Sequence, residues 1–412
     1  LKLLFISNEL TATDDLARLF VADNQHRTPD YELPRHYTAT ENVLRGNWKH
    51  QLDARHSFDS GLEMAINRHD ENLQFDSQSN APYLSTEIND IEEKRFEAFV
   101  HYNFSISSTL NLQASLIHER STMDVATNYS LASDTTTQAS SQSSRTFNYF
   151  KPRLNIRYDL DDVYQVRFNL ERTVSQLNLD DFVPGFNRDE IRLEETNPNL
   201  KPEVRDELSF TLEKQWLTSE GSISLTPYYH RISDLITEIP LTKHSGAGNI
   251  DKAKEYGLTL NTNFDFREIG LENTLISLGH TWRRSQMIHP FTGKSTDIEN
   301  LSDSDWNLKL DQNDILPGLS FSVNISRQSD YYYSRFDYQA SSLRDYVGDA
   351  SLDYKINQHL KIRLLAENLF NRKSKLERTR YPGLFTDNEP SRFEQRTYER
   401  TRRYTLTLTG QF

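Results

Sequence analysis

The sequence predicts an all-β protein, a transmembrane antiparallel β-barrel, and three observations support this fold class. In the last nine residues, Tyr404, Leu406 and Leu408 share one face of an extended strand, and threonines occupy the other face. Such alternation recurs in about sixteen segments of roughly ten residues, the length with which a tilted strand crosses a bilayer. Short and long connections between the segments alternate, as they do in outer-membrane barrels with short periplasmic turns and long extracellular loops.

The composition agrees with a thin-walled barrel around a watery interior. Apolar residues make up 36% of the 412 residues, yet aromatic residues reach 11%. A barrel of this kind needs few buried aliphatic side chains but many aromatic ones for its two interfacial girdles. The longest apolar runs, Leu3–Ile6 and Leu19–Ala22, are far shorter than the roughly 18–20 residues of a membrane helix.

Several classes of function are not expected from this sequence. The absence of cysteine excludes disulfides and thiolate metal sites, and a net charge of −13 without a basic block argues against a nucleic-acid partner. The 12 histidines are scattered without metal-ligand spacing, and no motif of an enzyme stands out, so we expect neither a cofactor, nor a metal, nor catalysis. Asp180-Asp181 and Asp303-Ser-Asp305 leave calcium binding on an outer loop open, although solvated turn acids are the commoner explanation.

The expected strands follow one another in pairs joined by short turns. Leu1–Ile6 has neither the charged segment nor the cleavage site of a signal peptide, so residues 1–412 are interpreted as a partial barrel domain whose N-terminal part has been removed. In chain order the expected strands are Leu1–Ile6, Val43–His50, His56–Arg68, Phe96–Phe104, Leu110–Arg120, Leu154–Tyr158, Tyr164–Leu170, Leu208–Leu212, Ile223–Tyr229, Tyr256–Phe266, Leu271–Arg283, Trp306–Leu310, Leu319–Ser326, Gly348–Ile356, Leu360–Asn368 and Tyr404–Phe412. The long polar connections expected between them are 11–40, 70–90, 128–144, 175–202, 233–251, 285–303, 328–345 and 371–396.

The two faces of these strands differ in the way a barrel requires. Apolar sets at even positions, such as Leu154 with Ile156 and Leu258 with Leu260, are expected to face lipid. The opposite face carries charges in mid-strand, which cost little only beside a water-filled lumen. These charged residues are Glu207, Glu213, Asp265, Asp353, Lys355, Lys361 and Arg363. A soluble sheet would need cover for its apolar face, and no helical pattern in the chain supplies it.

Two short motifs and the last residue resemble the TonB-dependent receptors of the outer membrane. Asn197-Pro-Asn-Leu-Lys-Pro-Glu203 is similar to the segment that opens a barrel strand in that family, and Glu367-Asn-Leu-Phe-Asn-Arg-Lys373 is similar to one near the end of the barrel. We interpret both as structural, with prolines restricting the backbone and the aromatic ring of the second at the membrane interface. The residues concerned are Asn197, Pro198, Leu200, Lys201, Pro202, Glu203, Asn368, Leu369 and Phe370, and the resemblance makes Phe412 part of an insertion signal.

The resemblance implies a monomeric receptor of a Gram-negative outer membrane. Such a receptor takes up a scarce ligand, for example a ferric siderophore, with energy from the TonB complex. Barrels of this class have about 22 strands around a plug, so the plug and roughly six strands are expected to be missing, together with the segment that contacts TonB. A passive porin-like or purely structural barrel is the alternative, and a barrel hydrolase is a more distant one.

The loops suggest where a ligand binds. One loop gathers Tyr331, Tyr332, Tyr333 and Arg335, and the next adds Arg378 and Arg380. Rigid aromatic side chains offer contact area at little entropic cost, and the arginines suit an anionic chelate. We therefore predict that at least one of Tyr332, Tyr333 and Arg380 contacts the ligand. The alternative is that the tyrosines form the outer aromatic girdle and the basic residues meet lipopolysaccharide phosphates.

Overall fold

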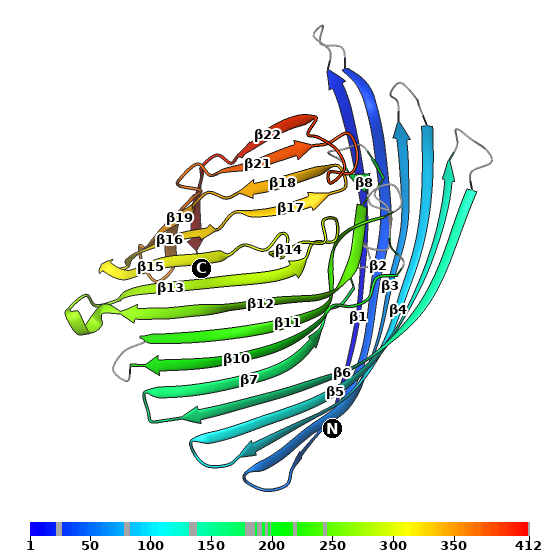
Figure 1. The fold of residues 1–412 in the computed structure, drawn as a ribbon. Helices are drawn as coiled ribbons and strands as arrows, with labels where there is room; N and C mark the ends of the chain where they lie inside the picture. The colour runs from blue at the N-terminus through cyan, green and yellow to red at the C-terminus, as the bar shows by residue number, and fades with distance from the viewer. Residues whose placement is uncertain are drawn as a thin grey trace. The chain divides into compact units, whose positions relative to one another are not determined.

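The structure, a computed structural model, describes residues 1–21, 27–77, 83–131, 138–177, 186–187, 192–193, 197, 199–216, 221–241 and 245–410. In this part of the chain antiparallel strands dominate, with the 3-10 helix η2 (Phe266–Ile269) between two of them (Figure 1). None of the described helices is long and apolar enough to cross a membrane. The chain divides into two compact units. Unit 1 comprises residues 1–104, 113–153 and 174–202, and unit 2 comprises residues 105–112, 154–173 and 203–412.

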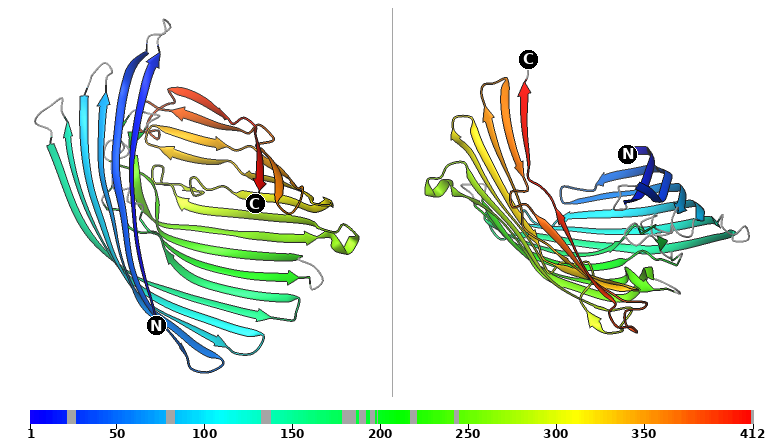
Figure 2. Two further views of the ribbon diagram at one scale, coloured as in Figure 1. Left: turned by 180° about the vertical axis from the view of Figure 1, so that it is seen from behind. Right: turned by 90° about the horizontal axis from the view of Figure 1, so that it is seen from above.

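Unit 1 is built on long strands that pair in chain order (Figure 2). The buried hydrophobic residues of its strands occupy odd-numbered positions, as Ala65, Ile91 and Met123 show, whereas the even-numbered Leu62 and Met64 are exposed. This alternation is the period of two that the sequence predicts for a wall with two different faces. The strands are β1 (Lys2–Val21), β2 (Arg27–Gln51), β3 (His56–Ser77), β4 (Tyr83–Ser105) and most of β5 (Leu110–Leu131) and β6 (Gln138–Asp159), with the short pair β8 (Phe186–Asn187) and β9 (Arg192–Leu193).

Unit 2 contains two sheets. The larger one continues the up-and-down pattern through β7 (Tyr164–Val174), β10 (Val204–Gln215), β11 (Ser222–Pro240), β12 (Ser245–Asp265), β13 (Thr274–Ile288), β14 (Ser295–Thr296), β15 (Ser304–Leu316), β16 (Leu319–Gln328), β19 (Val347–Lys355), β20 (Leu360–Glu367) and β23 (Arg403–Gly410). The smaller one is a four-stranded sheet of β17 (Tyr331–Arg335), β18 (Tyr338–Leu343), β21 (Lys373–Arg380) and β22 (Arg392–Glu399). Figure 1 shows these four strands lying side by side.

Every expected strand overlaps an observed one, but many observed strands are much longer than ten residues. Strand β3 has 22 residues and β4 has 23, so the prediction of a long loop at 70–90 was wrong. The expected loops at 128–144 and 233–251 likewise consist largely of strand, and those at 328–345 and 371–396 hold the four-stranded sheet. Backbone pairing continues through the expected loop at 70–90, where polar residues such as Glu71 and Asn89 lie opposite each other and form a hydrogen bond of 3.4 Å.

The short turns share a simple chemical device. A side-chain oxygen near the start of the turn accepts hydrogen bonds from backbone amides two or three residues later, which closes the chain into an Asx- or Ser-turn. In the β6–β7 turn, Asp161 Oδ1 accepts from the amides of Val163 and Tyr164 at 2.7 Å each. Asp53, Ser107 and Asn357 hold the equivalent place in three other short turns. Four of the predicted short turns are thereby confirmed, and we name the end of the strands at which they lie the short-turn end.

Candidate ligand-binding site

The four-stranded sheet brings together the two segments in which the sequence predicts ligand contacts. Strand β18 pairs with β17 on one side and with β21 on the other, and β21 pairs with β22. A single cross-strand row therefore contains Tyr333, Ala340, Arg378 and Glu394. These residues come from two hairpins, one between β16 and β19 and one between β20 and β23, so the sheet lies at the end opposite the short turns.

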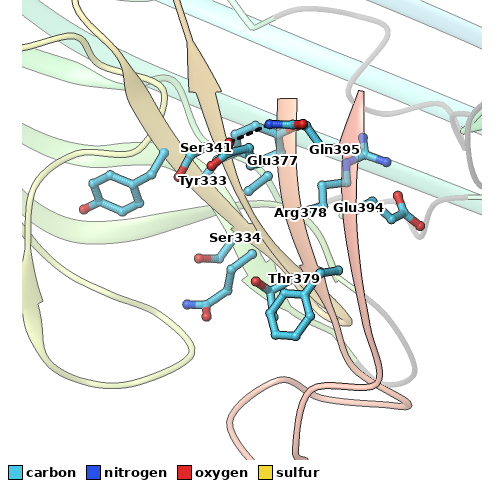
Figure 3. A pocket seen from close by; sticks show the side chains of 12 residues that line it. Tyr333, Ser334, Ser341, Glu377, Arg378, Thr379, Glu394 and Gln395 are labelled. Carbon is cyan, nitrogen blue, oxygen red and sulfur yellow. Dashed lines mark hydrogen bonds between the residues drawn. The ribbon is translucent and has the colours of Figure 1, made fainter. Parts of the chain in front are cut away.

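A cavity of about 550 Å³ lies against this sheet. Figure 3 shows Tyr333, Arg378 and Glu394 around it. Its size falls within the range of roughly 300–1,000 Å³ that small-molecule sites occupy. Its lining is mostly polar and uncharged, with two carboxylates, one guanidinium and three aromatic rings. The lining residues are Tyr332, Tyr333, Ser334, Gln339, Ala340, Ser341, Glu377, Arg378, Thr379, Phe393, Glu394 and Gln395.

Three of the six predicted ligand residues line the cavity, and three lie elsewhere on the same sheet. Tyr332, Tyr333 and Arg378 belong to the lining. The Tyr332 hydroxyl already donates to the carbonyl oxygen of Asp297 at 2.8 Å. The Arg378 guanidinium is buried and stacks over the ring of Tyr338, 4.7 Å from its centroid.

The other three predicted residues make internal contacts. Tyr331 accepts a hydrogen bond from the Arg344 guanidinium at 2.6 Å. Arg335 stacks over the Tyr333 ring at 5.1 Å and lies 3.5 Å from a Glu238 carboxylate oxygen.

Arg380, the last of the six, donates from Nε to Glu394 Oε1 at 2.7 Å and also stacks over Tyr338 at 5.2 Å. The predicted basic set therefore does not form an unpaired cationic patch.

The electrostatics of the sheet follow from these contacts. Burial raises the pKa of the Tyr332 hydroxyl above its usual value. Burial alone would do the same for Tyr331, but hydrogen bonds with Ser342 and Arg344 bring its pKa below that value. The pKa of Glu394 is lowered against its burial, because the charge of Arg380 lies beside it. The carboxylate in the cavity wall is thus held in its charged form.

A buried histidine near the cavity was not singled out by the sequence. His289 Nε2 lies 3.2 Å from Ser334 Oγ and 3.3 Å from Glu299 Oε1, which superficially resembles a hydrolase triad. However, His289 Nδ1 accepts the amide hydrogen of Phe291 at 3.2 Å, so the ring proton is on Nε2. An Nε2 that donates to the serine does not take its proton, and the cluster serves as packing under Phe291 and Phe385. No sequence motif marks His289, and only its distances to Ser334 and Glu299 in the folded protein identify the cluster.

Metal binding gains no support from the described residues. They contain no cluster of three or more His, Asp or Glu side chains arranged to hold an ion. The sequence left calcium binding at Asp303 and Asp305 as an alternative. Each of these carboxylates is paired with an arginine instead, Asp303 with Arg284 at 2.8 Å and Asp305 with Arg283 at 2.6 Å. Asp180 and Asp181 lie outside the described residues.

The first family motif forms a local turn anchored by a buried leucine. Asn197 Oδ1 accepts the Asn199 amide at 2.9 Å, and the Leu200 amide donates to the Asn197 carbonyl at 3.3 Å. Leu200 is fully buried, and its carbonyl oxygen accepts from Arg145 at 3.1 Å. Pro202 is buried, Lys201 is exposed and Glu203 pairs with Arg205 at 3.2 Å, whereas Pro198 lies outside the described residues. These contacts agree with a structural interpretation of the motif.

The second family motif forms the turn after β20. Asn368 has a left-handed backbone with φ 56°, and its Oδ1 accepts the Arg372 amide at 2.8 Å. The Leu369 amide donates to the Gly348 carbonyl at 2.7 Å, which ties the turn to β19. Phe370, expected at the membrane interface, is half-exposed. Phe412 lies outside the described residues.

Comparison with protein families decides the identity of the fold. The family described as TonB dependent receptor-like, beta-barrel matches residues 5–369. This chain belongs to that family. The predicted fold class, a transmembrane β-barrel, and the predicted bacterial outer-membrane location are thereby confirmed. No curated protein sequence matches the chain.

Several solved structures share the fold of this chain at low sequence identity. The ferric yersiniabactin uptake receptor FyuA from Yersinia pestis is similar at a TM-score of 0.66 and 15% identity, covering 99% of this chain and 59% of FyuA. The siderophore receptor PiuA from Acinetobacter baumannii is similar at 0.66 and 12%, covering 99% and 62%. The copper transporter OprC is similar at 0.69 and 13%, again covering 99% and 62%. The receptor barrel thus spans less than two thirds of the length of these proteins.

Proposed function

We propose that this barrel is part of a receptor that takes up a scarce ligand, a ferric siderophore or a similar compound, across the outer membrane. The energy would come from the TonB complex, reached through a part of the protein outside this chain, and no chemical conversion of the ligand is involved. The observation that carries the proposal is the cavity of about 550 Å³ on the four-stranded sheet, at the end opposite the short turns. In a barrel with periplasmic short turns, that end faces the outside medium, where a scarce ligand arrives.

The lining of the cavity suits a large polar ligand. Tyr333 and Phe393 offer aromatic surface, and Phe393 is 77% exposed. Hydroxyl and amide groups of Ser334, Gln339 and Gln395 offer hydrogen bonds. Arg378 is a cation beside Glu377 and Glu394, so the lining carries charges of both signs.

Energy coupling is tested by uptake in intact cells. The full-length receptor is expressed in strains with and without a functional TonB complex, and the uptake of radiolabelled ferric siderophores is measured. We expect accumulation only in the strain with the complex. Equal accumulation in both strains would indicate a passive barrel instead.

Ligand contact is tested by equilibrium binding to the purified full-length receptor. Alanine at Tyr332, Tyr333 and Arg380 together is expected to weaken binding about tenfold, or about 1.4 kcal/mol. Arg378→Ala is expected to do the same alone, because Arg378 lines the cavity. Lys375→Ala is the matched control, since Lys375 lies on the same strand but outside the lining. Unchanged affinity in correctly inserted variants would show that these residues do not contact the ligand and have only a structural role.

A further inference from the structure

The outward face of unit 2 is ordered in rows that change from aliphatic to aromatic to cationic. Strands β11 and β12 pair in an unbroken register from Ser222 to Ser233. On this face Leu225 lies opposite Leu260, and two residues further along each strand Pro227 lies opposite Leu258. These side chains belong to the apolar set that the sequence predicts to face lipid. Each step of two residues advances about 7 Å along a strand.

The next row is aromatic. Tyr229 lies opposite Tyr256, and their exposed fractions are 44% and 47%. Tyrosines on the outer face of a barrel mark the level of the lipid headgroups, where a ring is half in hydrocarbon and half in water. Because β11 and β12 continue past this row toward the end opposite the short-turn end, the row belongs to the outer leaflet.

The row immediately beyond the tyrosines is cationic. Arg231 lies directly opposite Lys254, and Lys252 follows on the same face of β12. Across β13, Arg284 lies opposite Tyr256. Like charges placed directly opposite each other on a sheet repel and destabilise it. A negatively charged partner at this level would remove the repulsion and stabilise the two paired strands.

The described residues do not supply that charge. Asp206, which lies opposite Arg231, is held by Arg172 through two hydrogen bonds of 2.6 and 2.9 Å. Asp303 is paired with Arg284 at 2.8 Å. No carboxylate in the described part of the chain pairs with Arg231, Lys252 or Lys254.

We propose that Arg231, Lys252 and Lys254 form a binding site for the phosphorylated headgroup of an outer-leaflet glycolipid, the lipid A part of lipopolysaccharide. The site is placed where the acyl chains of such a lipid lie along the aliphatic rows and its phosphates reach the level just beyond Tyr229 and Tyr256. Phosphate oxygens accept charge-assisted hydrogen bonds from guanidinium and ammonium groups and remove the repulsion between Arg231 and Lys254. This lipid site is separate from the cavity on the four-stranded sheet, so lipid binding there does not depend on which ligand the receptor transports.

The experiment uses the full-length receptor in detergent and native mass spectrometry with added lipid A. Binding is compared among bis-phosphorylated, mono-phosphorylated and dephosphorylated lipid A, at two salt concentrations. We expect affinity to fall with each phosphate removed and with rising salt, because the contact is electrostatic. In the variant R231S/K252S/K254S, the affinity for bis-phosphorylated lipid A is expected to fall at least tenfold.

A matched control separates this site from net charge. The variant K355S/K361S/R363S removes one arginine and two lysines from positions that the sequence assigns to the lumenal face. It is expected to bind lipid A as the native receptor does. Equal losses in the two variants, or binding that does not depend on the phosphates, would overturn the proposal. The shift between heated and unheated samples on a gel shows that each variant is folded.

Discussion

The ring of Phe370 lies across the backbone of Gly348, so that a Cβ atom on Gly348 would lie 2.9 Å from Phe370 Cδ2 and closer still to the neighbouring ring carbon. The family motif after β20 is thereby packed onto β19 at a position with no side chain. We predict that Gly348→Ala destabilises the barrel by about 1–3 kcal/mol, the usual effect of overpacking. The measurement is urea unfolding of the full-length receptor refolded into lipid vesicles.

Gly279→Ala is the control for this prediction. A Cβ on Gly279 would meet only Asn261 Oδ1, at an ordinary contact distance of 3.4 Å. This variant is expected to unfold within about 0.5 kcal/mol of the native receptor. Similar losses in both variants would mean that glycine is needed in these strands for reasons other than the Phe370 ring.

The same turn depends on Asn368. Its side-chain oxygen accepts the Arg372 amide at 2.8 Å, its own amide donates to Asp349 Oδ1 at 2.9 Å, and its φ is 56°. Asn368→Ala removes the acceptor and leaves a residue that disfavours a left-handed backbone, so we expect a loss of about 1–3 kcal/mol. Asn368→Asp keeps the acceptor and should lose less. Equal unfolding free energies for both variants would contradict this role.

The assignment of faces predicts a contrast between adjacent residues of β12. Leu260 lies opposite Leu225 in the aliphatic rows, and Asn261 is on the other face. Leu260→Arg is expected to cost about 2–4 kcal/mol and to reduce the amount of receptor inserted in the outer membrane, because arginine would face hydrocarbon. Asn261→Arg should insert normally. Immunoblots of outer-membrane fractions measure both, and equal levels would refute the assignment.

The raised pKa of Glu87 leads us to predict that the free energy of unfolding depends on pH. It lies on β4, well beyond the segment Phe96–Phe104 that is expected to cross the bilayer, and burial raises its pKa from 4.5 to about 8. Between about pH 4.5 and pH 8 the folded protein keeps a proton that the unfolded chain releases, so the free energy of unfolding falls as pH rises through this window. Glu87→Gln cannot ionise. It should therefore be more stable than the native receptor at pH 9 and nearly equal to it at pH 4.5, as measured by urea unfolding.

Glu92 on the same strand provides a control of opposite sign. Hydrogen bonds from Lys94 and Arg68 lower its pKa, so its contribution to stability is present above its unfolded pKa and is lost as pH falls. Glu92→Gln should therefore reduce stability at pH 9, where Glu87→Gln increases it. A common direction for the two variants at pH 9 would show that the effect is not specific to the burial of Glu87.

The sequence by itself determined the strand class, the two faces and the short turns of this protein. Side chains alternate with a period of two in any strand, so Leu258 and Leu260 reveal their face without knowledge of the neighbouring strands. The turn residues Asp53 and Asp161 act on amides two or three positions away, which is also local information. The family motifs could be recognised in the sequence because each is a run of adjacent residues.

Only the tertiary structure decided where strands end, which loops form a sheet, and which charges are already paired. The segments 328–345 and 371–396 lack alternation, yet they pair through their backbones to place Tyr333 and Arg378 in one row. The pairing of Arg380 with Glu394, and of Asp206 with Arg172 and not with Arg231, likewise depends on register between strands. Register is fixed by contacts between residues far apart in the chain, and a one-residue slip would exchange every face, so no local pattern contains it.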